Sequence, residues 1–240
     1  SDTTANNLQV FDDNGNYLYN ITPTPQPNPS QLHGGIAIDS FGEVYFCDSA
    51  NGNVEGFILG PSSATYDYTW SGQGHLVNPN DVKIDPQGNL VVADNFNGLV
   101  FNFAWTDDTL LNNTTQGGFN LAGVALDASG NIYATNQSGT TAQVVEYDYA
   151  YNYLGAFSGS GWPTPLSLPI GIAVDSQSNL WIVDTYNSRV VQATTQGQYL
   201  GAVSTGLLPP SRPQYLTFDA IGSLFVTDPA DFVIDQFLYN

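Results

Sequence analysis

The sequence predicts an all-β fold, a β-propeller of four-stranded antiparallel blades, and this prediction depends on an internal repeat. Five copies of one phrase follow one another and begin at Gly35, Asp81, Gly123, Gly171 and Tyr215. The first aspartates of these copies are Asp39, Asp85, Asp127, Asp175 and Asp219, so the copies lie 46, 42, 48 and 44 residues apart. A period of roughly 40 to 50 residues is typical of propeller blades.

The fourth copy shows how one blade is read from the sequence. Its four short segments are predicted to be strands, and they are Ile172–Asp175, Leu180–Asp184, Arg189–Ala193 and Tyr199–Val203. Asp175 begins the turn between the first two strands, where an aspartate can accept hydrogen bonds from backbone amides two residues on. Because all five copies have this aspartate, we expect it to hold the turn rather than to perform chemistry.

The N-terminal residues do not begin a repeat. Residues 6–21 match the second half of one, with Leu8–Phe11 as a third strand and Tyr17–Ile21 as a fourth. They are expected to close the last blade, which would remove an open sheet edge. Residues 22–31 contain four prolines and predict an extended linker. The chain is therefore expected to be one propeller over residues 1–240, with a closing half-blade (1–21), a linker (22–31) and five repeats (32–240).

The strand count leaves one third strand in excess. Five blades need five third strands, whereas the sequence offers six, and either Leu8–Phe11 or Phe232–Leu238 has no place of its own. A six-bladed fold is the alternative, but the sequence shows no sixth complete blade. The excess strand could complete a neighbouring molecule's blade, and a head-to-tail contact of that kind builds a fibre.

The repeated phrase, apolar-D-x-x-G-N-apolar-apolar-apolar-x-D-x-x-N-x-x-V, resembles the NHL repeat. Its fullest copy is GIAVDSQSNLWIVDTYNSRV, beginning at Gly171. The resemblance covers nearly all of the chain and implies a propeller fold. It implies no particular function, because this fold hosts enzymes, ligand binders and scaffolds.

Charge narrows the range of partners. Twenty-two acidic residues against three basic ones give a net charge of −19, so nucleic acid and anionic lipid surfaces would repel the chain. The sequence has no apolar run that could cross a bilayer, and its opening is similar to the start of a mature secreted chain. A single cysteine, Cys47, rules out an intrachain disulfide. Cys47 is expected to be a small core residue.

Other charged positions are predicted to be structural. A second set of side chains ends each second strand and consists of Asp48, Asp94, Asn136, Asp184 and Asp228. Lys83 lies in a column of small residues on the first strands. We expect it to form an ion pair, since a lysine there needs a carboxylate.

The residues needed for catalysis are sparse. Propellers of the amidating-lyase type hold zinc with three histidines, whereas this chain has only His33 and His75. Lactonase-like propellers hold calcium with glutamates among other ligands, and the three glutamates here, Glu43, Glu55 and Glu146, align with no axial position. Calcium bound by Asp and Asn alone stays open. We therefore predict no catalytic residues, no cofactor site and no metal site.

Four sequons predict covalent N-glycans, at Asn20, Asn112, Asn113 and Asn136. Together with the low content of charged residues, they favour an extracellular glycoprotein. The predicted function is a non-catalytic structural or interaction propeller that self-associates, head to tail, into a glycosylated fibre or surface layer. One alternative is a glycan- or peptide-binding propeller that uses Trp70, Trp105 and Trp162, with Trp181 in the core. The least favoured alternative is a metal-dependent hydrolase or lyase.

Overall fold

The structure is a computed structural model of the chain, and it describes residues 6–12, 14–23, 32–115, 120–138, 142–204, 212–230 and 233–237. Most of the predicted linker, residues 24–31, therefore lies outside the described residues. The chain forms two compact units, residues 1–113 and 114–240, each considered separately.

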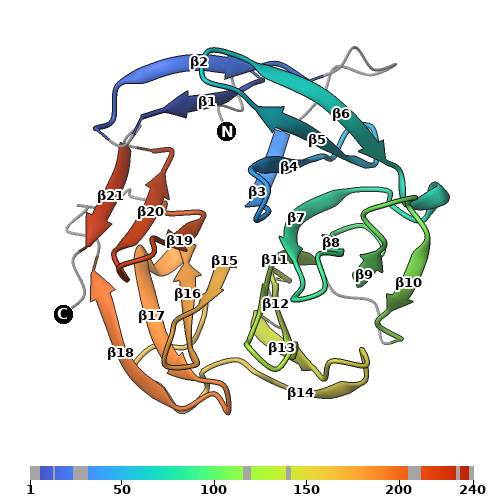
Figure 1. The fold of residues 1–240 in the computed structure, drawn as a ribbon. Coiled ribbons are helices and arrows are strands. Elements are labelled where there is room, and N and C mark those ends of the chain that lie inside the picture. The colour runs from blue at the N-terminus through green and yellow to red at the C-terminus, as the bar shows by residue number, and fades with distance from the viewer. Residues whose placement is uncertain are drawn as a thin grey trace. The chain divides into compact units, whose positions relative to one another are not determined.

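Unit 1 contains a hairpin and two four-stranded antiparallel sheets (Figure 1). The hairpin pairs β1 (Leu8–Phe11) with β2 (Tyr17–Ile21). The first sheet is formed in chain order by β3 (Leu32–Ile38), β4 (Glu43–Asp48), β5 (Asn53–Leu59) and β6 (Ala64–Trp70). The second sheet is formed by β7 (Pro79–Ile84), β8 (Leu90–Asp94), β9 (Leu99–Phe103) and β10 (Leu110–Asn113).

Unit 2 contains two more four-stranded sheets and one of three strands. Its first sheet is formed by β11 (Leu121–Leu126), β12 (Ile132–Asn136), β13 (Gln143–Tyr147) and β14 (Tyr153–Phe157). The next is formed by β15 (Pro169–Val174), β16 (Asn179–Asp184), β17 (Arg189–Thr194) and β18 (Tyr199–Ser204). The last is formed by β19 (Leu216–Phe218), β20 (Leu224–Asp228) and β21 (Val233–Phe237).

The predicted fold class is confirmed: the chain is an all-β, five-bladed β-propeller of antiparallel sheets. The five blades begin with β3, β7, β11, β15 and β19. Within the described residues the helices are two short 3₁₀ turns, η1 (Gly72–Gly74) and η2 (Thr185–Asn187). Closure of the last blade by β1 and β2 would join the two units and stays a prediction.

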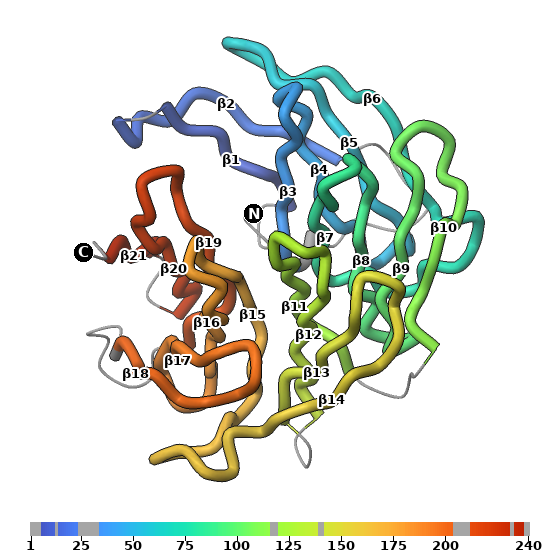
Figure 2. The backbone as a smooth tube through the Cα atoms, turned by 60° about the horizontal axis from the view of Figure 1, so that its bottom comes forward, coloured from blue at the N-terminus to red at the C-terminus, as the bar shows by residue number. Residues whose placement is uncertain are grey.

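The β1–β2 hairpin has the geometry of a third and fourth strand. Its register shifts between Val10 and Phe11, as the β13–β14 register shifts between Glu146 and Tyr147. The hairpin packs against the first blade, where Leu8, Tyr19 and Ile21 share a buried cluster with side chains of β4 and β5 (Figure 2). The hairpin has only two strands, so it covers only part of this blade. The side chains of Ile36 and Ile38 in β3 are exposed.

The blades within each unit pack through apolar side chains. In unit 1 one buried cluster joins β3–β6 to β7–β10 and includes Trp70 and Cys47. In unit 2 the Trp181 and Phe218 rings meet edge to face, with centroids 5.7 Å apart, and join the β15–β18 blade to β19. Trp181 is buried, as predicted, and so is Cys47. Burial raises the pKa of the Cys47 thiol, so it stays protonated in the core.

The ion pair predicted for Lys83 is present. Lys83 Nζ lies 2.7 Å from Asp81 Oδ1, which is buried, and also donates to the Val82 carbonyl. Gly35 of the preceding blade faces this pair so closely that a Cβ atom there would collide with the Asp81 carboxylate. Gly35 therefore has to be glycine for the two blades to meet around the ion pair.

Candidate functional site

In all five blades, Oδ1 of the turn aspartate accepts hydrogen bonds from the backbone amides two and four residues on. Asp175 Oδ1, for example, accepts hydrogen bonds from the amides of Gln177 (2.9 Å) and Asn179 (2.8 Å). Its other oxygen, Oδ2, accepts from the side-chain Nδ2 of Asn179 and from the indole of Trp181. These donors lower the pKa of Asp175, although burial acts in the opposite direction. A carboxylate that is used in this way holds the turn.

The second set of side chains ties the incoming loop to the blade at Asp94, Asn136, Asp184 and Asp228. All five are fully buried: Asp48, Asp94, Asn136, Asp184 and Asp228. Asp94 Oδ2 accepts from the amides of Val77 (2.7 Å) and Asn78 (2.9 Å) in the preceding loop. Asn136 Oδ1 accepts in the same way from the amide of Asn120.

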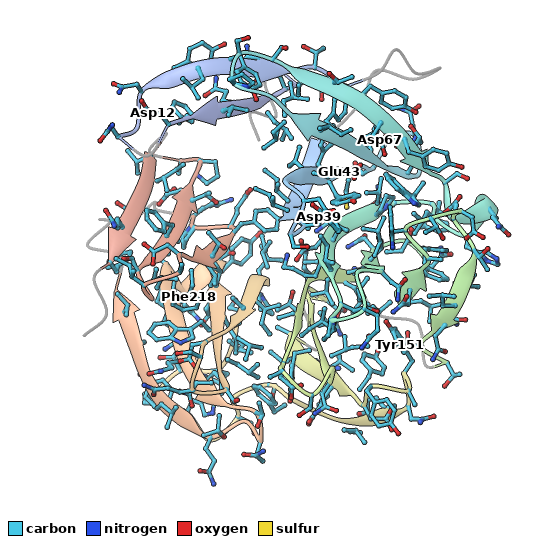
Figure 3. All side chains as sticks on the ribbon, viewed as in Figure 1. Asp12, Asp39, Glu43, Asp67, Tyr151 and Phe218 are labelled. Atoms are coloured by element: carbon cyan, nitrogen blue, oxygen red, sulfur yellow. The ribbon has the colours of Figure 1, made fainter. Side chains whose placement is uncertain are left out.

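The first blade departs from this pattern at Glu43. Three other blades have asparagine at the equivalent position, and its Nδ2 donates to the turn aspartate, as at Asn89, Asn131 and Asn179. Glu43 cannot donate unless it is protonated. Its side chain is only 9% exposed and lies near Asp39, and its Oε1 makes no hydrogen bond within the described part of the chain (Figure 3).

Two further departures lie next to Glu43. At the bulge of the fourth strand the other hairpins have an exposed leucine, namely Leu18, Leu111, Leu154 and Leu200, whereas the first blade has Asp67. Opposite Tyr45 the first blade has Gly56, where the other blades have Asn102, Glu146, Gln192 and Gln236. A Cβ on Gly56 would lie 2.9 Å from Glu43 Oε1 and 2.6 Å from the Trp70 ring. Glycine therefore makes room for the glutamate.

Two of these departures, Glu43 and Asp67, form a carboxyl cluster with the turn aspartate Asp39 and the Tyr45 hydroxyl. Desolvation, a hydrogen bond with Asp67 and repulsion by the other carboxylates raise the pKa of Glu43 to about 7. Tyr45 donates to Asp39 Oδ2 at 3.3 Å, and burial raises the pKa of its hydroxyl. Glu43 can therefore bind and release a proton near neutral pH.

A second glutamate repeats the arrangement in unit 2. Glu146 stands where Asn102 and Gln192 donate amide hydrogens to a turn aspartate in their own blades. Desolvation first, and then repulsion by Asp127, raise the pKa of Glu146. Sequence analysis missed both glutamates as a site. Their signal was a carboxyl at a repeat position that is an amide in other blades.

The remaining candidates do not come together as a catalytic site. His75 is exposed and its ring centroid lies 6.1 Å from that of Phe101, while the side chain of His33 lies outside the described residues. Among the described residues, no three His, Cys, Asp or Glu side chains are placed to hold a metal ion. Calcium bound by Asp and Asn alone stays a prediction. Among the described residues, no helix is long and apolar enough to cross a membrane.

The tryptophans differ from the prediction in one respect. Trp70 was proposed as a ligand-binding residue, but it is 1% exposed and packs in the core of unit 1. Its indole donates to the Trp105 carbonyl at 3.1 Å and thereby ties one blade to the next. The cause is its position, because the last residue of a fourth strand points between blades. Trp105 is 45% exposed, and Trp162 is half-buried.

The asparagines of the four sequons differ in solvent exposure. Asn20 and Asn112 are exposed and Asn113 is half-buried, all three on fourth strands. Asn136 is fully buried at the end of β12, where its side chain accepts two backbone hydrogen bonds. A glycan on the buried Asn136 Nδ2 would have no room in the folded blade, so the first three are the sites that a folded blade presents.

Comparison with known proteins supports the repeat and the fold. Residues 166–192, in the β15–β18 blade, match the NHL repeat family. The chain has the fold of NHL-type β-propellers. No curated protein matches it in sequence.

Three solved structures of enzymes share this fold at low identity. Virginiamycin B lyase from Staphylococcus aureus is 16% identical, with a TM-score of 0.67 over 99% of this chain and 79% of the lyase. A gluconolactonase from Xanthomonas campestris is 17% identical, with a TM-score of 0.74 over 95% of this chain and 77% of that enzyme. Hydrazine synthase from Kuenenia stuttgartiensis is 12% identical, with a TM-score of 0.68 over 99% and 90%. At these identities the likeness concerns the fold alone.

Proposed function

We propose that this chain is a non-catalytic, extracellular structural or interaction propeller that self-associates through the outer edges of its blades. The observation that carries the proposal is the character of the fourth strands. The bulged leucines at 18, 111, 154 and 200 are each about half exposed, and so are Tyr17, Tyr66, Tyr68 and Tyr153. Exposed apolar side chains of this kind are typical of interaction surfaces when they recur together.

The outer edges also lack the usual protection against pairing. Natural edge strands commonly have lysines or prolines that prevent association. The fourth strands contain a single charged residue, Asp67, and no lysine or arginine. The bulges are a protective device that these strands keep. An edge of this kind favours contact with a second copy and so supports head-to-tail assembly into a fibre or layer.

The structural use of the acids also favours a non-catalytic function. The turn aspartates and the buried aspartates both accept backbone hydrogen bonds, so most of the acidic repeat positions are committed to the fold. A metal-dependent hydrolase or lyase is less favoured, because this chain's two histidines cannot supply a three-histidine site. The carboxyl cluster around Glu43 is suited to proton exchange, and no three His, Cys, Asp or Glu side chains among the described residues are placed to hold a metal ion.

Self-association is expected to depend on the bulged leucines. Leu154 and Leu200 have no partner in the strand register, so lysine can replace both without loss of a ladder bond. The double variant Leu154→Lys, Leu200→Lys should weaken association at least about tenfold, because it places two charges on the apolar edge. Light scattering against concentration measures the effect.

The matched control for that experiment is Ile221→Lys. Ile221 is 86% exposed in the β19–β20 turn, away from any fourth strand. The Ile221→Lys variant should associate as strongly as the wild-type protein. Equal association of all three proteins would show that the outer edges are not the contact surface.

We expect N-glycans on Asn20 and on Asn112 or Asn113 in protein from the native source, and none on Asn136. The three favoured sites lie on fourth strands, and polar glycans would compensate for the low content of charged residues. Intact-mass and peptide mass spectrometry would locate them. A mass equal to that of the bare polypeptide would contradict the extracellular part of the proposal.

A further inference from the structure

A pocket of about 520 Å³ lies in unit 2, between the end of β14 and the turn that joins β17 to β18. It opens to solvent and involves none of the bulged leucines. Three aromatic side chains, Phe157, Trp162 and Tyr199, form its apolar wall, and the rest comes from serines, glycines, Ala156 and Gln198. The volume is that of an ordinary small-molecule site.

The aromatic wall is held in place before any ligand arrives. The Trp162 centroid lies 5.9 Å from that of Phe157 and 5.7 Å from that of Tyr199. The Trp162 indole donates to the Gly197 carbonyl at 3.0 Å, which fixes the ring plane. A Cβ on Gly197 would lie 2.6 Å from the Phe157 ring, so glycine is needed for the ring to pack against the backbone.

Unit 1 has a related bond between two blades. There the indole comes from Trp70, the last residue of β6, and it donates to the equivalent turn of the next blade. Phe157 occupies that strand position in unit 2, as its pairing with Val144 matches that of Trp70 with Val54. Phenylalanine has no donor, so the indole is supplied instead by Trp162 from the following loop. Trp70 is 1% exposed, whereas Phe157 and Trp162 are half-buried.

The lining chemistry restricts the ligand class. None of the ten lining residues is charged. A charged ligand would therefore lose hydration without gaining an ion pair, and the net charge of −19 disfavours anions in particular. Serine hydroxyls and the Gln198 amide can both donate and accept hydrogen bonds. A ligand that is complementary to this pocket has an apolar ring face that packs on the aromatic rings, and neutral hydroxyl groups that form hydrogen bonds with the polar residues.

We propose that this pocket is a binding site for a neutral saccharide, with one sugar ring stacked against the Trp162–Tyr199 wall and its hydroxyls bonded to Ser158, Ser160 and Gln198. The site goes beyond the proposed self-association and uses different residues. The sugar could come from a glycan on a second copy or from an unrelated polysaccharide. The chemistry recognised is the same in both cases.

Calorimetric titration of the 240-residue chain with maltose, cellobiose, lactose and chitobiose tests the proposal. We expect at least one of these disaccharides to bind with a dissociation constant of about 0.1 to 10 mM, because an open pocket immobilises only one or two rings. Tyr199→Ala and Gln198→Ala should each weaken that binding about tenfold or more. Gln198 is exposed, so its variant should fold even if Tyr199→Ala does not.

The matched control is Tyr153→Ala. Tyr153 is the first residue of β14 as Tyr199 is of β18, and it does not line the pocket. Its variant should bind the disaccharide like the wild type. The proposal would be overturned if none of the four disaccharides bound. It would also be overturned if Tyr153→Ala weakened binding as much as Tyr199→Ala does, or if acidic sialyllactose bound more tightly than the neutral sugars. If a glycan-free preparation self-associates but binds no sugar, the sugar-site proposal fails and the self-association proposal stands.

Discussion

Replacing Asp184 by alanine is expected to lower the free energy of unfolding by about 3 to 5 kcal/mol, because the variant leaves a buried cation without its partner. Asp184 is fully buried, and its Oδ2 lies 2.7 Å from the Arg189 guanidinium, whose side chain is 13% exposed. Its Oδ1 accepts from the Ser167 amide at 2.7 Å. The loss therefore combines an uncompensated charge with an unsatisfied amide of the incoming loop. Urea denaturation measures it.

Asp184→Asn is the conservative comparison for this experiment. The third blade has Asn136 at the same position and bonds its incoming loop through the amide oxygen. The asparagine variant should therefore keep the loop bond and lose the bonds that Oδ2 accepts from Arg189 and Asn187, with a smaller cost than alanine. Equal losses in the two variants would show that the loop bond contributes nothing, contrary to the role given to these five residues.

The second large effect concerns pH and Glu43. In the folded chain the pKa of Glu43 is about 7, whereas its ordinary value is 4.5. Between these two values the folded state keeps a proton that the unfolded state releases, so stability falls as pH rises from about 4.5 to 7 and levels off above. We expect Glu43 to account for a loss of about 1 to 3 kcal/mol over this range.

Glu43→Asn should remove most of that pH dependence and stabilise the protein at pH 8, since asparagine restores the amide donor of the other blades. Part of the dependence should remain, because the pKa of Glu146 is raised in the same direction. The reciprocal variant Asn179→Glu places a glutamate beside Asp175 and should introduce a new loss of stability above pH 5. Unfolding free energies measured from pH 5 to 8 test both variants. An unchanged pH profile in Glu43→Asn would refute the assignment.

The fold could be predicted from the sequence because the same hydrophobic pattern recurs in each of the five copies of the repeat. The turn aspartates and the apolar run that ends at Asp184, for instance, indicate where the strands begin and end. The half-repeat at residues 6–21 was recognised from the same pattern, and its bulge and turn have the geometry of β13–β14. Local turn chemistry and period-two burial are both visible in sequence.

The carboxyl cluster could not be predicted in this way. Glu43, Gly56 and Asp67 lie on three different strands, and each is unremarkable as a single residue. Their meaning depends on register, which places Gly56 opposite Tyr45 and leaves room for the glutamate. Trp70 was misread for a related reason. An aromatic residue at the end of an outer strand can face solvent or the next blade, and packing between blades decides which.

Sedimentation velocity on the 240-residue chain, over about a hundredfold range of concentration, tests the central claim of self-association most directly. We expect the weight-average sedimentation coefficient to rise with concentration, and the Leu154→Lys, Leu200→Lys variant to rise less. Wild-type protein that sediments as a monomer at every concentration would contradict the proposed function.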